Sequence, residues 1–192
     1  MEGEIQIKKA DPISFDLMKS IVDKLLESGR WRQALMLAIP SYLLIRFSDY
    51  VHLKWIDFES DRIIMREQKT QKTKKVRNIK LGNEIRELVK KAKPAEANSE
   101  DYIFRNSFNC PLSIQFINAE LKKIKDEFNI PVQHFSTHSL LKTGCLRVFE
   151  NKGKSDSALM LICRIRNHSN PGITLNYLNL GQGAIDEAYE SL

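Results

Sequence analysis

Four short stretches of this sequence contain residue types that could carry out chemistry on a phosphate group. In chain order they hold Arg46, a lysine-rich segment that includes Lys69, then His138, and finally His168 and Tyr177, which are nine residues apart. Arginine can donate two parallel hydrogen bonds to a phosphate, lysine and histidine can transfer protons, and a tyrosine hydroxyl can act as a nucleophile. A functional prediction depends on all four stretches, because each one alone has an ordinary structural explanation.

Those ordinary explanations differ from stretch to stretch. Arg46 could form a salt bridge with Asp49, and a single histidine or tyrosine is usually a helix cap or an amphipathic core residue. The segment 69–77 has no acidic residue, so it could lie along a DNA backbone or could simply protect a sheet edge from aggregation. The candidate DNA-binding residues in or near these stretches are Lys72, Lys74, Lys75, Arg77 and Lys142.

The elements that must position these residues follow from the apolar periodicity. Ser14 can cap a helix that Gly29 ends, and a second helix is expected from about Trp31 to Arg46, with Pro40 predicting a kink or a break. Two β-type runs, 62–68 and 75–81, predict a hairpin. Further helices are expected over about 84–93, 113–128, 139–151, 156–166, around Tyr177 and over 184–191, with a short strand over 102–104. The predicted fold class is mainly α with a small antiparallel β-sheet (α+β).

The size and charge of the chain agree with a DNA-binding domain. A chain of 192 residues suits one compact domain, and its net charge of +6 with a pI of about 9.2 favours polyanionic partners. Three scattered cysteines, a polar acidic start and the absence of a long apolar run predict a cytoplasmic protein with no signal peptide and no membrane partner.

Together, in this order and at this spacing, the four stretches resemble the catalytic domain of the tyrosine recombinase, or phage integrase, family. That family carries an arginine, a lysine on a β-hairpin, the pattern His-x-x-Arg, a histidine or tryptophan, and a tyrosine. Here Arg46, Lys69, His138, His168 and Tyr177 match these positions. The resemblance runs from about residue 12 to residue 182. Within the family, the chain is most similar in pattern to integrases of bacterial mobile elements or prophages.

The resemblance implies a reaction and a role for each residue. Tyr177 would attack a DNA phosphate to form a 3′-phosphotyrosine, and no cofactor or metal would be needed because the covalent bond stores the energy of the broken phosphodiester. Lys69 would be the general acid toward the leaving 5′-oxygen, with Lys72 as the alternative because the hairpin register is uncertain. His138 would assist proton transfer near the tyrosine oxygen, and Arg46 and His168 would stabilise negative charge.

One position departs from the family pattern. The second arginine of the family belongs at position 141, where this chain has Leu141, which offers neither a donor nor a charge. Three explanations stay open: an introduced change, a natural loss, or replacement by another cation. Lys142, Arg147 and Arg164 are candidates for that cation, although Arg147 lies about 240° around a helix from position 141. We therefore expect impaired or absent cleavage.

Domain organisation and partners follow from the same resemblance. Residues 1–13 are predicted to be a linker and residues 14–192 the catalytic domain, without the N-terminal DNA-binding domain of the family. Double-stranded DNA is the expected partner, with a tetramer on DNA and a monomer alone. A catalytically silent DNA-binding or regulatory protein on the same scaffold is the alternative function, and a helical interaction domain unrelated to DNA is the third hypothesis.

Overall fold

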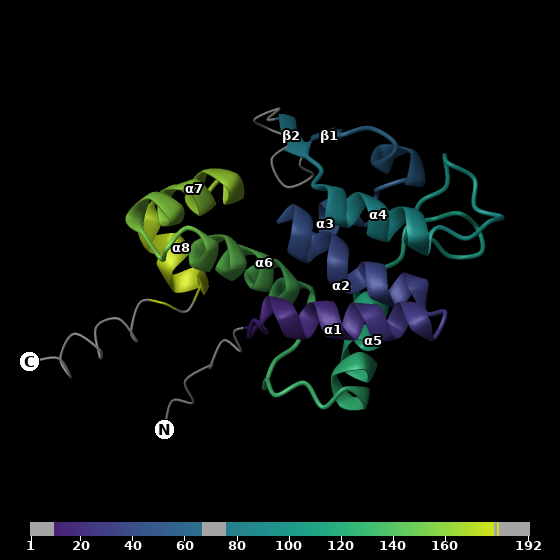
Figure 1. Ribbon diagram of the computed structural model, residues 1–192, viewed down its shortest axis with the longest axis horizontal. Helices are drawn as coiled ribbons and strands as arrows, with labels where there is room; N and C mark the ends of the chain where they lie inside the picture. Colours follow the sequence, from purple (N-terminus) through teal and green to yellow (C-terminus); the bar gives the residue numbers. More distant parts are fainter. Residues whose placement is uncertain (1–9, 67–75, 179, 181–192) are drawn as a thin grey trace, which may run out of the picture.

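The computed structural model describes residues 10–66, 76–178 and 180, and within these ranges the chain is mainly helical with one small sheet (Figure 1). The predicted fold class is confirmed. The elements, in chain order, are α1 (Phe15–Glu27), α2 (Trp31–Leu43), α3 (Phe47–Tyr50), the 3-10 helix η1 (Trp55–Phe58), β1 (Arg62–Arg66), β2 (Val76–Lys80), α4 (Asn83–Ala92), α5 (Ile114–Glu127), α6 (Thr137–Asn151), α7 (Asp156–Arg166) and α8 (Pro171–Leu178).

The helix ends follow local sequence signals. The Ser14 side chain accepts a hydrogen bond from the backbone N–H of Leu17 at 3.1 Å, and the Ser113 side chain does the same for Phe116 at the start of α5. Gly29 has a φ of 73°, a conformation that glycine adopts without strain, and this ends α1. Capping residues therefore predicted these helices well.

The second helix ends three residues earlier than the sequence predicted. α2 runs through Pro40 without a break and stops at Leu43, because Leu44 adopts the left-handed conformation with a φ of 53°. Arg46 is consequently not the last residue of α2 but the N-cap of α3. The turn at Leu44 leaves its backbone carbonyl as an acceptor for Arg166 and Arg77.

The predicted hairpin is present. β1 and β2 pair antiparallel, with Arg62 opposite Lys80 and Arg66 opposite Val76. The tip of the hairpin, with Lys69, Lys72, Lys74 and Lys75, lies outside the described residues. The prediction of a strand over 102–104 is wrong, because Tyr102 forms only an isolated β-bridge with Lys54.

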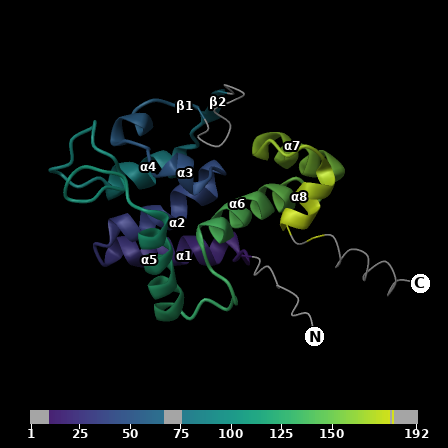
Figure 2. The same ribbon diagram turned by 180° about the vertical axis from the view of Figure 1, so that it is seen from behind.

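Two apolar clusters divide the molecule. The larger one draws mainly on α1, α2, α4 and α5, and Figures 1 and 2 show these helices together on one side of the molecule. The smaller one belongs to α6, α7 and α8 and to the turn after α2, and its buried members are Leu44, Leu141, Cys145, Leu159, Ile162 and Leu178. Helix α6 extends from the large cluster to the small one (Figure 2).

A glycine allows α6 to cross α2 at close range. A Cβ atom at Gly144 would lie 1.9 Å from the carbonyl oxygen of Ser41, which no folded arrangement could accommodate without a shift. The Ser41 hydroxyl reinforces the crossing by donating to the Leu140 carbonyl at 3.1 Å. This contact fixes the second half of α6 against the turn at Leu44.

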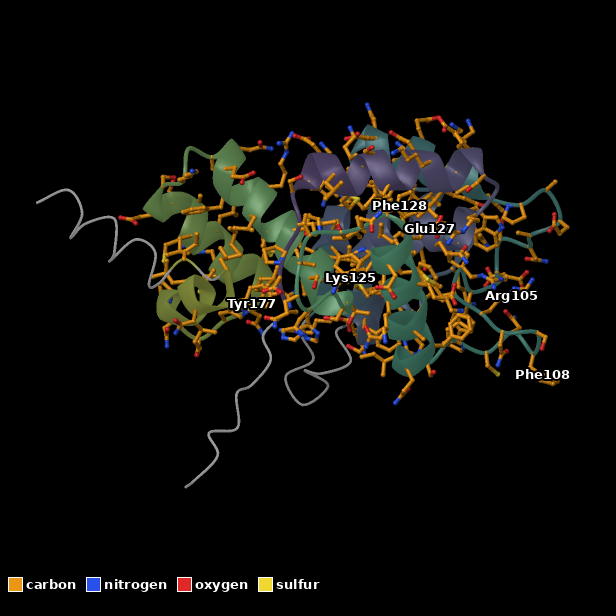
Figure 3. All side chains as sticks on the ribbon, turned by 90° about the horizontal axis from the view of Figure 1, so that it is seen from below. Arg105, Phe108, Lys125, Glu127, Phe128 and Tyr177 are labelled. Carbon is orange, nitrogen blue, oxygen red and sulfur yellow. The ribbon has the colours of Figure 1, made fainter. Side chains whose placement is uncertain are left out.

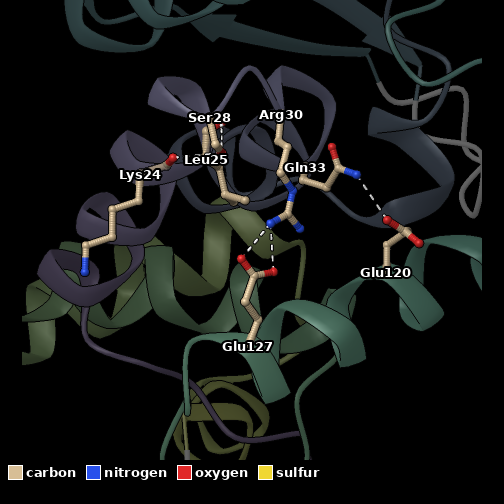
Figure 4. Close-up of polar contacts among 7 residues, drawn as sticks. All are labelled: Lys24, Leu25, Ser28, Arg30, Gln33, Glu120 and Glu127. Atoms are coloured by element: carbon tan, nitrogen blue, oxygen red, sulfur yellow. Dashed lines mark hydrogen bonds and ion pairs between the residues drawn. The ribbon is translucent and has the colours of Figure 1, made fainter.

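Polar contacts join the beginning of α2 to α5. The guanidinium of Arg30 donates to both carboxylate oxygens of Glu127 at 2.7 Å, and Gln33 donates to Glu120 at 3.1 Å (Figure 4). The Arg30 and Glu127 side chains are partly exposed, so this ion pair contributes little to stability.

The segment before α1 packs on the domain. Asp11 exchanges hydrogen bonds with His134, and the backbone N–H of Ile13 donates to the Thr143 hydroxyl at 3.1 Å. The boundary at residue 13 stays a prediction. Among the helices in the described ranges, none has the length and apolar character needed to cross a bilayer.

Candidate active site

Tyr177 lies near the end of α8, on the side of the molecule formed by α6, α7 and α8 (Figure 3). Its hydroxyl oxygen is buried and has no hydrogen-bond partner among the described residues. Three basic side chains surround its ring. The His168 ring lies 5.5 Å away edge-on, the Lys142 Nζ atom lies 5.3 Å from the ring centroid, and the Arg166 Cζ atom lies 5.9 Å from it.

Burial and the neighbouring arginines act on the Tyr177 hydroxyl in opposite directions. Burial raises the pKa of the phenol well above its usual range, and Cys145 adds to this increase. Arg166 and Arg46 lower the same pKa, because a positive charge favours the phenolate. Tyr177 is therefore protonated at neutral pH, and the two arginines are the groups that favour its deprotonation.

His168 follows α7 and is held by a neighbouring hydroxyl. Its Nδ1 atom lies 2.9 Å from the Thr174 hydroxyl oxygen. Burial lowers the pKa of His168 first, and the charges of Arg166 and Arg46 lower it further. A neutral imidazole at pH 7 can donate one hydrogen bond and accept another, and it adds no further positive charge to the site.

Three arginines meet at the junction between the two halves of the molecule. The Leu44 carbonyl accepts hydrogen bonds from Arg166 at 2.8 Å and from Arg77 at 3.3 Å. The Arg166 carbonyl in turn accepts from Arg46 at 3.3 Å. We call Arg46, Arg77 and Arg166 the arginine cluster. It joins the turn after α2, strand β2 and the end of α7.

Arg166 is the residue that the sequence reasoning missed. It is only 2% exposed, and a buried arginine is rare unless it is paired. A signal was available in the sequence. Leu159, Ile162 and Cys163 are apolar and follow helical spacing. Arg166 continues the same face, because it comes four residues after Ile162 and three after Cys163. A charged residue on the apolar face of a predicted helix, two positions before His168, indicates a functional role.

Leu141 sits in the apolar interior of the small cluster. It is 2% exposed and packs with Leu44 and Cys145, so position 141 offers no donor to a phosphate. Among the cations proposed as replacements, Lys142 is buried beside the Tyr177 ring. Arg147 lies over the Phe15 ring, and Arg164 is exposed. Of the three, only Lys142 is near Tyr177.

His138 is placed at the start of α6 and is exposed. Its backbone N–H donates to the Ser136 hydroxyl, which caps the helix. Because side chains four residues apart share a helix face, His138 lies one turn from Lys142. The structure thus brings Arg46, Lys142, His168 and Tyr177 together and places His138 one helical turn away. In the described ranges, no group of three or more His, Cys, Asp or Glu side chains could hold a metal ion.

The model of the phage integrase family matches residues 13–182. The chain belongs to the phage integrase family. No curated protein sequence matches the chain significantly.

Solved structures of family members have the same fold. The XerA recombinase has a TM-score of 0.66 at 17% identity, over 100% of this chain and 66% of that one. A lambda integrase dimer bound to a COC′ core site has a TM-score of 0.65 at 15% identity, over 91% and 61%. The integrase of transposon Tn1549 in complex with a circular intermediate DNA has a TM-score of 0.62 at 18% identity, over 95% and 67%. The chain thus spans about two thirds of the length of these proteins. The fold is that of the tyrosine recombinase catalytic domain.

Proposed function

We propose that this integrase family member is the catalytic domain of a site-specific DNA recombinase in which Tyr177 is the nucleophile. The observation that carries the proposal is the buried, unpartnered Tyr177 hydroxyl, whose ring is contacted by Lys142, Arg166 and His168. A phenol placed beside two cations and a neutral imidazole, without a described hydrogen-bond partner, suits a hydroxyl that is used only when an anionic substrate arrives.

The reaction is a phosphoryl transfer in two reversible steps. The Tyr177 oxygen gives its proton to His138 and bonds to phosphorus, while the bond from phosphorus to the 5′-oxygen breaks. Lys69 gives the leaving 5′-oxygen a proton, so the products are a 3′-phosphotyrosine and a 5′-hydroxyl, and Lys72 is the alternative acid. Attack by the 5′-hydroxyl of a different strand reverses these bonds and joins the DNA.

The remaining residues act on charge and position. Arg46 binds a non-bridging oxygen of the phosphate, neutral His168 donates a hydrogen bond to the same group, and His138 assists proton transfer near the tyrosine oxygen. Lys74, Lys75, Arg77 and Lys142 contribute contacts to the DNA backbone. Removal of one such donor in other enzymes costs roughly 10²–10³ in rate.

Double-stranded DNA is the proposed partner, with a tetramer on DNA and a monomer without it, in the cytoplasm. Support comes from the relatives. XerH site-specific recombinase is bound to a palindromic difH substrate in a post-cleavage complex, and lambda integrase is a dimer on its core site. This chain covers 53% of the XerH chain, so XerH is about twice as long as the part of it that matches this chain.

Covalent capture tests the proposal. The chain is incubated with labelled, nicked duplexes taken from the DNA that flanks its own gene, and an adduct that survives SDS is measured. We expect an adduct that Tyr177→Phe abolishes, with Tyr102→Phe as the control. An adduct that persists in Tyr177→Phe would contradict the assignment of the nucleophile.

A silent DNA-binding scaffold is the second candidate function, and buried Leu141 favours it because position 141 has no donor. This function predicts retarded migration of the same duplexes without any adduct. It also predicts that Tyr177→Phe leaves DNA affinity unchanged. An adduct formed by the unaltered chain would exclude it.

A further inference from the structure

We propose that Arg166 supplies the second guanidinium of the active site and donates to a non-bridging phosphate oxygen from α7, in place of a donor at position 141. This assignment rests on the proposed function, since it names a further catalytic residue for the same reaction. The donor would come from a different helix, but it would serve the same phosphate as Arg46.

The first support is that the Arg166 guanidinium is buried without an anionic partner among the described residues. The residue is 2% exposed, and within the described part of the chain no carboxylate pairs with it. Its Nη1 atom donates to the Leu44 carbonyl, while its buried Nε atom has no hydrogen-bond partner there. A buried guanidinium without an anion is strongly unfavourable, because burial removes the water that would otherwise solvate its charge. The missing partner is therefore an anion, and it would bind the edge of the guanidinium that contains Nε.

The second support is position. The Arg166 guanidinium lies under the Tyr177 ring, and the Arg166 carbonyl accepts a hydrogen bond from Arg46. Arg166 Nε and the Tyr177 hydroxyl are both buried without a hydrogen-bond partner among the described residues, and the Arg166 Cζ atom lies 5.9 Å from the centroid of the Tyr177 ring. A phosphate would meet both once the Tyr177 ring moves aside.

The third support is charge. The groups that act electrostatically on Arg166 are Arg46, Arg77, Tyr177 and Cys145, and none of them is a carboxylate. The positive charges of Arg46 and Arg77 both act against the charge of Arg166, and the Leu44 and Arg166 carbonyls accept hydrogen bonds from the three arginines. A phosphodiester would neutralise part of this charge, so the arginine cluster is already arranged for the anion before it binds.

Other cations fit the role less well. Lys142 packs its ammonium group against the Tyr177 ring and is a point charge without a planar fork. Arg164 is exposed and lies about 200° around α7 from Arg166. Arg77 shares the Leu44 carbonyl, but it is not among the groups that shift the pKa of Tyr177, whereas Arg166 and Arg46 are.

A charge exchange between two buried positions tests the proposal. The variants are Arg166→Leu, the double variant Leu141→Arg with Arg166→Leu, and Arg166→Lys. Arg164→Leu is the matched control on the same helix. At saturating nicked duplex, we expect Arg166→Leu to lower the rate of adduct formation by roughly 10²–10³-fold. The double variant should recover at least tenfold over the single one, Arg166→Lys should be intermediate, and the control should match the unaltered chain.

A DNA-independent arm separates this proposal from the proposed function. Orthovanadate, which resembles the phosphate in the transition state, is titrated into each variant by calorimetry. We expect saturable binding that Arg166→Leu weakens at least tenfold and that the double variant restores. If vanadate binds in this way and no variant forms an adduct, the proposed function fails while Arg166 remains an anion ligand. If adducts form equally with and without Arg166, the assignment of Arg166 fails while the function stands.

Folding is checked by the melting temperature of each variant. Leucine at position 166 would extend the apolar face of α7, so we expect Arg166→Leu to melt no lower than the unaltered chain. A purely structural arginine predicts a lower melting temperature and no change in the vanadate affinity of the folded fraction. That pair of results, or an unaltered chain that does not bind vanadate, would overturn the proposal.

Discussion

The two apolar clusters of this integrase are built on different principles. The larger cluster is closed by aliphatic and aromatic side chains of α1, α2, α4 and α5, and many of them are fully buried. The smaller cluster also contains leucines, but Arg166 and the Tyr177 hydroxyl are buried against it without complete partners. A cluster of this kind is less stable than it could be, which is typical of a site arranged for a ligand. The large cluster provides the scaffold, and the small one keeps the chemistry in position.

The comparison predicts that a truncation in the large cluster affects stability alone. Leu35 is fully buried in the middle of α2, so Leu35→Ala should lower the free energy of unfolding by about 4 kcal/mol. The folded fraction should form the adduct at an unchanged rate. Chemical denaturation and covalent capture at low temperature measure the two effects.

Leu159→Ala is the counterpart in the small cluster. Leu159 is 7% exposed and shares the face of α7 with Arg166, so we expect a smaller loss of about 2 kcal/mol together with slower adduct formation. Equal effects of the two substitutions on the rate would show that the two clusters do not differ in the way described.

The connection between the clusters gives the next prediction. Gly144→Ala would place a Cβ atom 1.9 Å from the Ser41 carbonyl, so it should cost about 3 kcal/mol of stability and should also slow adduct formation. Gly82→Ala is the control, because a Cβ atom there meets nothing within 4 Å. Thermal melts of both variants check the prediction, and equal melting temperatures would contradict the close crossing of α6 and α2.

The smallest expected effect is the titration of His168. Burial, Arg166 and Arg46 lower its pKa below the ordinary 6.5, so NMR should find it neutral at pH 7. Below pH 6.5 the unfolded chain binds more protons than the folded one, and stability therefore falls from pH 6.5 down to the folded pKa. Arg166→Leu should raise the pKa of His168, whereas Arg164→Leu should leave it unchanged. An unchanged pKa in Arg166→Leu would place Arg166 too far from His168 to act on it.

The sequence predicted the scaffold better than the site. Ser14 caps α1 where expected, and Ser113 and Ser155 cap α5 and α7 at the expected helix starts, because capping depends on neighbouring residues alone. The strand expected over 102–104 did not form, because β-propensity becomes a strand only where a partner strand is available.

The site depended on contacts between distant segments. His168 and Tyr177 lie close together because they are nine residues apart in the same stretch of sequence. The burial of Arg166 under the Tyr177 ring depends on the αL turn at Leu44, 122 residues earlier in the chain, which supplies the carbonyl acceptor. Periodicity placed Arg166 on the apolar face of α7, but only the fold shows that Tyr177 covers it.

The attachment site on the protein tests the central claim most directly. After covalent capture, digestion with nuclease and trypsin should release the peptide from Asn167 to Leu192, which contains Tyr177 and Tyr189. Tandem mass spectrometry should find the residual nucleotide on Tyr177. A nucleotide on Tyr189, on a different peptide, or on none would contradict the account of Tyr177 as the nucleophile.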